Sequence, residues 1–328
     1  SAPVPPQKVA CNLHHSVSIC NHNGVDLEKG ETTLYTWGRN ITHVLGQGLE
    51  KGDAYIPRVV EPPLAAWATG EYALSSSAGT TAPYPYEVAC GTNHTLVLCK
   101  SPDERGGTVW ACGLQNHGRV GNTKDSSRLG EQNWVTETWM PVMVGGLHDV
   151  TSVLRICCGA DHSLCFTNSG LLYAWGLNSE GQCGTGGSHN VLTPTPIAPL
   201  PGHTGHEVQL GHFAAGARHS LLVSAAVGAG VGAAESTGQG SNLYTWGCGQ
   251  QGRLGLGGVY TNHGTPCAVE GISEKNLSFV AGGEAHSGVL DAGGKLWMWG
   301  IGANGRLGLG DTMDVPSPRR GRLPHAVE

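Results

Sequence analysis

The chain has 328 residues, 52 of them glycine and 11 cysteine, with 13% charged residues and a net charge of −6 at pH 7. That length allows one large domain or two ordinary ones, and the charge predicts no nucleic-acid partner. No apolar run is long enough to span a membrane. No cysteines form a Cys-x-x-Cys pair, so we expect no metal site. We predict buried thiols in a reducing intracellular compartment, without distinguishing cytoplasm, nucleus, cilium or organelle.

The first recurring pattern is a short apolar strand, a turn, and a histidine followed by serine or threonine. Its strongest copies read Cys-Gly-x-x-His-[Ser/Thr] at 90–95 and 158–163. Five equivalent copies argue against catalysis, because a catalytic histidine needs one distinctive set of partners. We predict a structural role in which the ring nitrogens, and the hydroxyls that follow, bond backbone groups at the turn. The repeat histidines are His15, His94, His162, His219 and His286.

The second pattern, Leu-Tyr-x-Trp-Gly and its variants, follows each copy of the first. Its copies lie at 34–38, 109–113, 172–176, 243–247 and 296–300. A glycine-rich loop and a proline-led strand, such as those that begin at Pro57 and Pro141, complete each unit. Large aromatic side chains at one repeated position predict packing between neighbouring sheets. The tryptophans with this predicted structural role are Trp37, Trp175, Trp246 and Trp299.

Four short alternating strands with glycine turns predict an antiparallel meander, and nothing along the chain has sustained helical periodicity. One such sheet buries too little surface to be stable alone, so we predict an all-β propeller in which copies pack face to face. We expect a single domain, 1–328, with insertions at 61–85, 123–140 and 225–241. The predicted repeats are 1–60, 86–144, 152–198, 208–270 and 276–328.

These motifs, in this order, resemble the RCC1 (regulator of chromosome condensation) repeat family over nearly the whole chain. The resemblance implies blades of four antiparallel strands, usually seven to a ring, whereas five repeats fill this sequence. Three interpretations stay open: part of a longer propeller, which we favour, a short or open ring, or a ring completed by another chain. The resemblance also implies an alternative function, guanine nucleotide exchange on a small Ras-like GTPase, although no segment aligns with the founding member's β-wedge.

Other chemistry finds little support in the sequence. The loops 252–257 and 305–310 lead into strands, not into a helix N-terminus, so they read as turns rather than phosphate cradles. His203, His206 and His212 lack the spacing of a zinc protease and are expected in an exposed loop. Photoreceptors of this fold carry tryptophan where Ala217 stands, so that function is rejected. We therefore predict no enzyme activity, no catalytic residue and no cofactor.

Function is expected in the segments that are not repeated. Aromatic residues and arginines on long loops are typical binding anchors, although they can also fold back over their own blade edge. The sequence thus favours a non-enzymatic protein–protein interaction scaffold, a subunit of a larger assembly whose protein partners it does not identify; a small GTPase is the alternative partner. The predicted partner-binding residues are Trp67, Tyr84, Tyr86, Arg128, Trp134 and Trp139.

Overall fold

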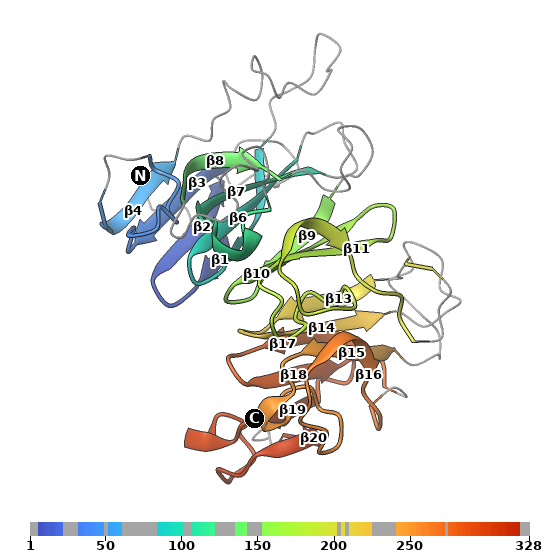
Figure 1. The fold of residues 1–328 in the computed structure, drawn as a ribbon. Coiled ribbons are helices and arrows are strands. Elements are labelled where there is room, and N and C mark those ends of the chain that lie inside the picture. Colours follow the sequence, from blue (N-terminus) through green and yellow to red (C-terminus); the bar gives the residue numbers. More distant parts are fainter. Residues whose placement is uncertain are drawn as a thin grey trace. The chain divides into compact units, whose positions relative to one another are not determined.

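The computed structural model in Figure 1 shows a protein built almost wholly of β-strands. The described residues form 20 strands and three 3₁₀ turns. They divide into two compact units: unit 1 comprises 1–177 with 190–195, and unit 2 comprises 178–189 with 196–328. The single-domain boundary stays a prediction. The structure describes residues 6–21, 32–48, 52–60, 84–100, 107–121, 135–142, 153–201, 205–206, 210–224, 241–272 and 275–321.

Unit 1 contains three four-stranded antiparallel blades, in which consecutive strands are neighbours. The second and third blades join into one eight-stranded sheet through the pairing of Gly107 with Val153. This arrangement confirms the predicted four-stranded blade. The strands are β1 (Pro6–Cys11), β2 (His15–Asn21), β3 (Thr32–Gly38) and β4 (Ala54–Val60) in blade 1, β5 (Tyr84–Cys90), β6 (His94–Lys100), β7 (Gly107–Leu114) and β8 (Val135–Pro141) in blade 2, and β9 (Val153–Cys158), β10 (His162–Thr167), β11 (Leu172–Gly176) and β12 (Val191–Pro196) in blade 3.

Blade 2 is buried on both faces, and the two-residue period of its strands explains how. Successive side chains of a strand point to opposite faces. In β6, Leu96 and Leu98 belong to the apolar core shared with blade 3. Val97 and Cys99, their neighbours along the strand, belong to the core shared with blade 1. The sequence of β6 is therefore apolar at successive positions, because both faces of blade 2 are covered by a neighbouring blade.

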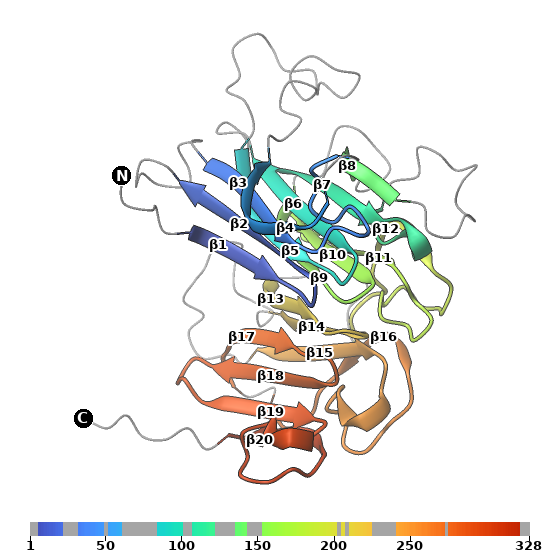
Figure 2. The same cartoon turned by 90° about the vertical axis from the view of Figure 1, so that its left-hand side faces the viewer.

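Unit 2 contains two more meanders of the same kind, seen with their strands side by side in Figure 2. Their shared core includes Leu221, Val223 and Val289, together with Trp299. The glycine-rich loop after β11 also belongs to this unit. The strands are β13 (Leu210–Ala215), β14 (His219–Ser224), β15 (Asn242–Gly247) and β16 (His263–Ala268) in blade 4, and β17 (Leu277–Gly282), β18 (His286–Asp291), β19 (Leu296–Gly300) and β20 (Val315–Arg320) in blade 5.

The closing strand of blade 2 lies earlier than its sequence indicated. The prediction placed this strand after Pro141 and treated 123–140 as an insertion, but β8 ends at Pro141 and occupies the last part of that segment. Pro141 lies opposite Trp110 at the end of the ladder, where a residue without an N–H group is tolerated. In the other predicted insertions, residues 61–83 and 225–240 lie outside the described residues.

Candidate functional site

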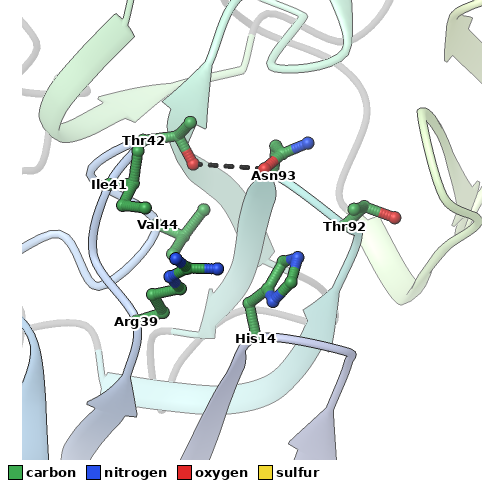
Figure 3. Close-up of a pocket in the computed structure, with 7 residues that line it drawn as sticks. All are labelled: His14, Arg39, Ile41, Thr42, Val44, Thr92 and Asn93. Carbon is green, nitrogen blue, oxygen red and sulfur yellow. Dashed lines mark hydrogen bonds between the residues drawn. The ribbon is translucent and has the colours of Figure 1, made fainter.

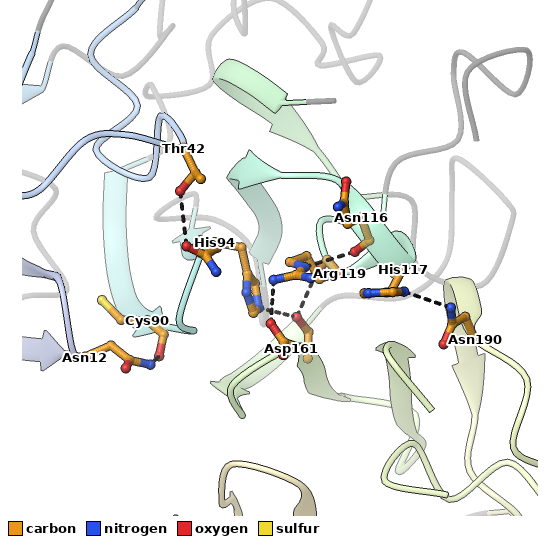
Figure 4. Close-up of polar contacts among 11 residues, drawn as sticks. Asn12, Thr42, Cys90, His94, Asn116, His117, Arg119, Asp161 and Asn190 are labelled. Carbon is orange, nitrogen blue, oxygen red and sulfur yellow. Dashed lines mark hydrogen bonds and ion pairs between the residues drawn. The ribbon is translucent and has the colours of Figure 1, made fainter. Parts of the chain in front are cut away.

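The repeated residues meet at the junctions between blades, and the junction of blades 2 and 3 shows their chemistry most fully. His94 Nε2 lies 2.9 Å from Ser163 Oγ in the next blade. The Ser163 hydroxyl donates to the Arg119 carbonyl at 3.0 Å, and the indole N–H of Trp175 donates to the same oxygen at 3.0 Å. Because the hydroxyl proton is used on the carbonyl, His94 must donate from Nε2. Figure 4 shows His94 and Arg119 at this junction.

The same relay recurs at other junctions. His15 Nε2 lies 2.8 Å from Thr95 Oγ1, and His219 Nε2 lies 2.8 Å from Ser287 Oγ. The acceptor is always the backbone carbonyl at one position of the glycine-rich loop, which we call the junction carbonyl. The histidine thus bonds the next repeat's hydroxyl, and not a backbone group as the sequence analysis expected. The junction carbonyls that accept these bonds belong to Val44, Arg119, Gln182 and Arg253.

Burial keeps the junction histidines neutral. Loss of solvation lowers the pKa of His15 to about 4, and that of His162 to about 3. It also holds the pKa of His94 well below its usual range. A neutral imidazole with Nε2–H can make the relay bond, whereas an imidazolium would place an uncompensated charge in the core. The neutral junction histidines therefore have a structural role in the relay.

Each tryptophan of the relay packs against a glycine two residues after the junction carbonyl, which we call the junction glycine. A Cβ added to Gly121, Gly184 or Gly255 would lie 2.6–2.8 Å from the indole nitrogen of Trp175, Trp246 or Trp299. All three tryptophans are fully buried. The repeated glycine therefore leaves room for the neighbouring blade's indole, in addition to adopting a positive φ that favours glycine.

Blade 2 builds its junction with blade 1 differently. Cys112 stands at the tryptophan position of the repeat, and its thiol donates weakly to the Val44 carbonyl at 3.4 Å. The indole comes instead from Trp139 of β8, which is 5% exposed. A Cβ on the junction glycine, Gly46, would lie 2.5 Å from the Trp139 ring. Trp139 thus occupies the position that motif tryptophans fill elsewhere, but its Nε1 has no hydrogen-bond partner among the described residues.

The predicted partner-binding residues fall in different environments. Tyr84 and Trp139 are buried, and Trp139 packs against Gly46 of blade 1. Tyr86 is half-buried and lies under two ammonium groups, with Lys8 Nζ 4.1 Å and Lys100 Nζ 3.5 Å from its ring centroid. The remaining predicted anchors, Trp67, Arg128 and Trp134, lie outside the described residues.

A pocket of about 90 Å³ opens among residues that are not repeated, and Figure 3 shows it. Three segments of unit 1 line it: the turn between β1 and β2, the loop after β3, and the turn between β5 and β6. Sequence reasoning missed this site, because each side chain lies within a repeated motif at a position where the repeat does not fix the residue. The lining residues are His14, Arg39, Ile41, Thr42, Val44, Thr92 and Asn93.

The pocket holds an arginine that no described side chain neutralises. Arg39 is exposed, and no described side chain pairs with it. By contrast, Arg119 on the equivalent loop of blade 2 is 4% exposed, pairs with Asp161 and donates from Nε to the Asn116 carbonyl at 2.9 Å. With His14 nearby, the pocket suits an acidic group on a partner.

Other candidate chemistry does not assemble in the described residues. No group of three or more metal-ligating side chains lies together there. His206 bonds the Ile197 carbonyl at 2.7 Å, His212 lies beside the ring of Phe279, and His203 is outside the described residues. All 11 cysteines are free thiols. Among the helices that the structure describes, none is long and apolar enough to cross a membrane.

Four-stranded blades joined by a repeated His–hydroxyl–carbonyl relay define a repeat protein of the β-propeller class. The model of the regulator of chromosome condensation (RCC1) repeat matches residues 106–166, 169–223 and 241–290, and a second model of that repeat matches 153–182. The chain belongs to the RCC1 repeat family.

Relatives support this assignment. The chain is 29% identical over 241 residues to the ultraviolet-B receptor UVR8 of Arabidopsis thaliana, covering 74% of this chain and 46% of the receptor. It is 30% identical over 273 residues to the X-linked retinitis pigmentosa GTPase regulator of Canis lupus familiaris, covering 68% of this chain and 24% of the regulator. The chain thus spans less than half the length of these two relatives.

A solved structure shows the same fold. Prp20p from Saccharomyces cerevisiae, whose structure was described with its binding to Gsp1p and histones, gives a TM-score of 0.60 at 18% identity. The match covers 97% of this chain and 77% of Prp20p. At that identity the likeness supports the RCC1-like propeller fold and carries no function across.

Proposed function

We propose that the chain is a non-enzymatic protein-interaction scaffold that binds an acidic segment of a protein partner through the pocket around Arg39. The observation that carries this proposal is the contrast between repeated and non-repeated residues. At the described blade junctions, repeat histidines, hydroxyls and tryptophans bond one another and the junction carbonyls, whereas Arg39 is exposed beside His14 without a partner among the described side chains. The buried free thiols favour a reducing intracellular compartment for this function.

The pocket can supply both charge and shape to an acidic partner. Arg39 offers a planar group that binds a carboxylate through two parallel hydrogen bonds, while the Thr42 hydroxyl donates to Asn93 Oδ1 at 3.4 Å. Ile41, which is 68% exposed, adds an apolar contact at the rim. Exposed arginines beside an apolar residue are typical of the few positions that dominate a protein interface.

A charge reversal tests the pocket directly. Partners that co-purify with the wild-type chain should be lost from Arg39→Glu, because the new carboxylate repels the acidic group. The matched control is Arg58→Glu on β4, another exposed arginine outside the pocket. Unchanged recovery with Arg39→Glu, measured by quantitative mass spectrometry, would contradict the proposal.

The long non-repeated segments offer a second contact surface, which deletions can test. Removing 61–83 and 122–134 and bridging each gap with a short glycine–serine linker spares β4, β5 and β8, which the structure assigns to blades. If both deletions leave partner recovery and chain folding unchanged, these loops carry no binding. Circular dichroism on each variant shows whether the blades persist.

Guanine nucleotide exchange on a small Ras-like GTPase is the alternative function. Its support is the similarity to a protein named as a GTPase regulator, which the chain matches over 273 residues. An assay of nucleotide release from Ran-, Rab- and Rho-type GTPases separates the two functions. Release well above the uncatalysed rate would favour exchange over a passive scaffold, and no acceleration with any of them would favour the scaffold.

A further inference from the structure

Blade 4 carries a cysteine–histidine pair on β16, the last strand of its sheet. The Sγ atom of Cys267 lies 3.1 Å from Nδ1 of His263 on the same strand. The other ring nitrogen, Nε2, lies 3.4 Å from the Thr261 hydroxyl. Cys267 and His263 are half-buried and Thr261 is exposed, so a small molecule in solution can reach the pair. A thiol beside an imidazole is an arrangement that gives a nucleophilic sulfur.

An irregularity of the strand brings the two side chains together. Residues four positions apart on a regular strand are separated by about 13 Å. The ladder pairs Cys267 with Thr245 of β15. Its next pair is His263 with Gly247, which leaves three residues of β16 opposite a single residue of β15. This bulge shortens the strand and re-aims its side chains, so the thiol and the imidazole meet.

The repeat itself does not require this pair. The same bulge occurs where β4 pairs with β3, β8 with β7 and β20 with β19, so the two positions that flank it can be compared between blades. None of these three blades has a cysteine or a histidine at either position, and the bulge forms without them. The residues at the two positions are Ala54 and Arg58 in blade 1, Thr136 and Met140 in blade 2, and Val315 and Arg319 in blade 5.

Hydrogen bonds hold the backbone on both sides of His263. The side-chain oxygen of Asn262, which precedes it, accepts from the Gly249 N–H at 3.1 Å. The carbonyl of Gly264, which follows it, accepts from the Gly186 N–H at 2.9 Å. Because the residues before and after it are fixed, the imidazole keeps its position beside the sulfur.

The imidazole supplies a base that the thiol needs. Partial burial raises the pKa of the Cys267 thiol, so little thiolate forms at neutral pH without help. The Thr265 carbonyl, at 3.6 Å from Sγ, can accept a hydrogen bond but cannot take up the proton. Nδ1 of His263 can take it up, while Nε2–H donates to the Thr261 hydroxyl.

We propose that Cys267 is a site of reversible modification by a low-molecular-weight disulfide such as glutathione disulfide. The Cys267 sulfur attacks one sulfur of the disulfide while His263 takes up the thiol proton. A new S–S bond joins Cys267 to one glutathione, and the S–S bond of the reagent breaks. The second glutathione leaves as a thiolate, which then takes the proton from His263. Cys267 is thereby oxidised and the leaving glutathione is reduced, and the reverse exchange restores the thiol.

The first experiment compares Cys267 with Cys11 in the wild-type chain, so it needs no variant. Cys11 is exposed, whereas Cys267 is half-buried. If exposure alone set the rate, Cys11 would react first. The chain is incubated with glutathione disulfide at neutral pH, and peptide mass spectrometry follows each site over time. We expect Cys267 to be modified at least tenfold faster than Cys11, because only Cys267 has a base at hand. Modification of Cys11 at an equal or higher rate would overturn the proposal.

The second experiment removes the base with His263→Thr. Blade 2 has threonine at the equivalent position, Thr136, so we expect the bulge to form in this variant. The modification of Cys267 should slow at least tenfold, while that of Cys11 should not change and so reports on an intact fold. The control His189→Thr replaces an exposed histidine of another loop and should react like the wild type. An unchanged rate at Cys267 in His263→Thr would show that the imidazole does not activate the sulfur, and would also overturn the proposal.

Discussion

Blades 2 and 3 solve the same packing problem with different residues. Blade 3 uses its motif tryptophan, Trp175, which packs on Gly121 and donates to the Arg119 carbonyl. Blade 2 has Cys112 at that position and brings in Trp139 from its outer strand, against Gly46. The junction therefore requires an indole on a glycine, and the strand that provides the indole can change.

The two solutions also differ in hydrogen bonding. The Trp175 indole N–H has an acceptor, whereas that of Trp139 has none among the described residues. A buried polar group without a partner costs free energy, of the order of 1–3 kcal/mol. We therefore expect the blade 2 junction to gain its stability from packing, and the blade 3 junction from packing and the relay together.

Truncating the indoles should have the largest effect. Trp175→Ala and Trp139→Ala each leave a large cavity, for which we expect a loss of about 3–5 kcal/mol in the free energy of unfolding. Trp175→Ala should cost about 1 kcal/mol more, because it also removes a satisfied hydrogen bond. Chemical denaturation measures both. A negligible effect of Trp139→Ala would show that the blade 2 junction does not depend on this indole.

Acid should weaken the relay. The folded pKa of His15 is about 4, below the usual value of 6.5, so the unfolded chain binds more protons between these values. Stability is complete above pH 6.5 and should fall as the pH drops, by about 3 kcal/mol by pH 4 for this histidine alone. Denaturation at several pH values should show a shallower dependence in His15→Gln than in the wild type. Exposed His189→Gln is the control, and equal slopes in all three proteins would contradict the account.

A methyl group should cost more at a glycine that contacts an indole than at a glycine that does not. Gly121→Ala places a Cβ 2.7 Å from the Trp175 indole at a φ of +74°, and we expect a loss of about 2–4 kcal/mol from overpacking and backbone strain. Gly308 stands at the same position of the loop after β19, with a φ of +63°, and a Cβ there meets no neighbour among the described residues, so for Gly308→Ala only backbone strain of about 1 kcal/mol remains. Thermal unfolding measures the difference, and equal losses would mean that contact with the indole is unimportant.

The smallest effect should come from replacing each indole by a phenyl ring. Both changes remove part of the packing, but only Trp175→Phe removes a hydrogen bond to the Arg119 carbonyl. We expect Trp175→Phe to cost about 1 kcal/mol more than Trp139→Phe. If Trp139→Phe is the more damaging change under the same denaturation conditions, the Trp139 indole nitrogen has a partner after all.

The sequence was sufficient to predict the blades, because strand alternation and glycine turns act locally. The strand predicted at 172–176, for example, coincides with β11. The pattern could not place Trp139, since this residue lies in a segment that does not repeat, and only the tertiary fold brings it to Gly46. The sequence did show that Cys112 replaces the motif tryptophan of blade 2, which was a sign that another residue supplies the indole.

The candidate site was harder to predict from the sequence than the fold was. The relay partner of His94 lies 69 residues away, so the hydroxyl acceptor could not be inferred from the turn alone. Arg39 follows directly after a repeated glycine and reads as part of a motif. Its exposure beside His14, and the pairing of Arg119 with Asp161, emerge only when blades pack together.

The measurement that tests the junction most directly is a double-mutant cycle between Cys112 and Trp139. Cys112→Trp alone should overpack a position that Trp139 already occupies, and Trp139→Ala alone should leave a cavity. The double variant moves the indole back to the motif position, so we predict that it is more stable than the sum of the single losses by at least about 2 kcal/mol. Additive losses would contradict the claim that one junction position accepts an indole from either strand.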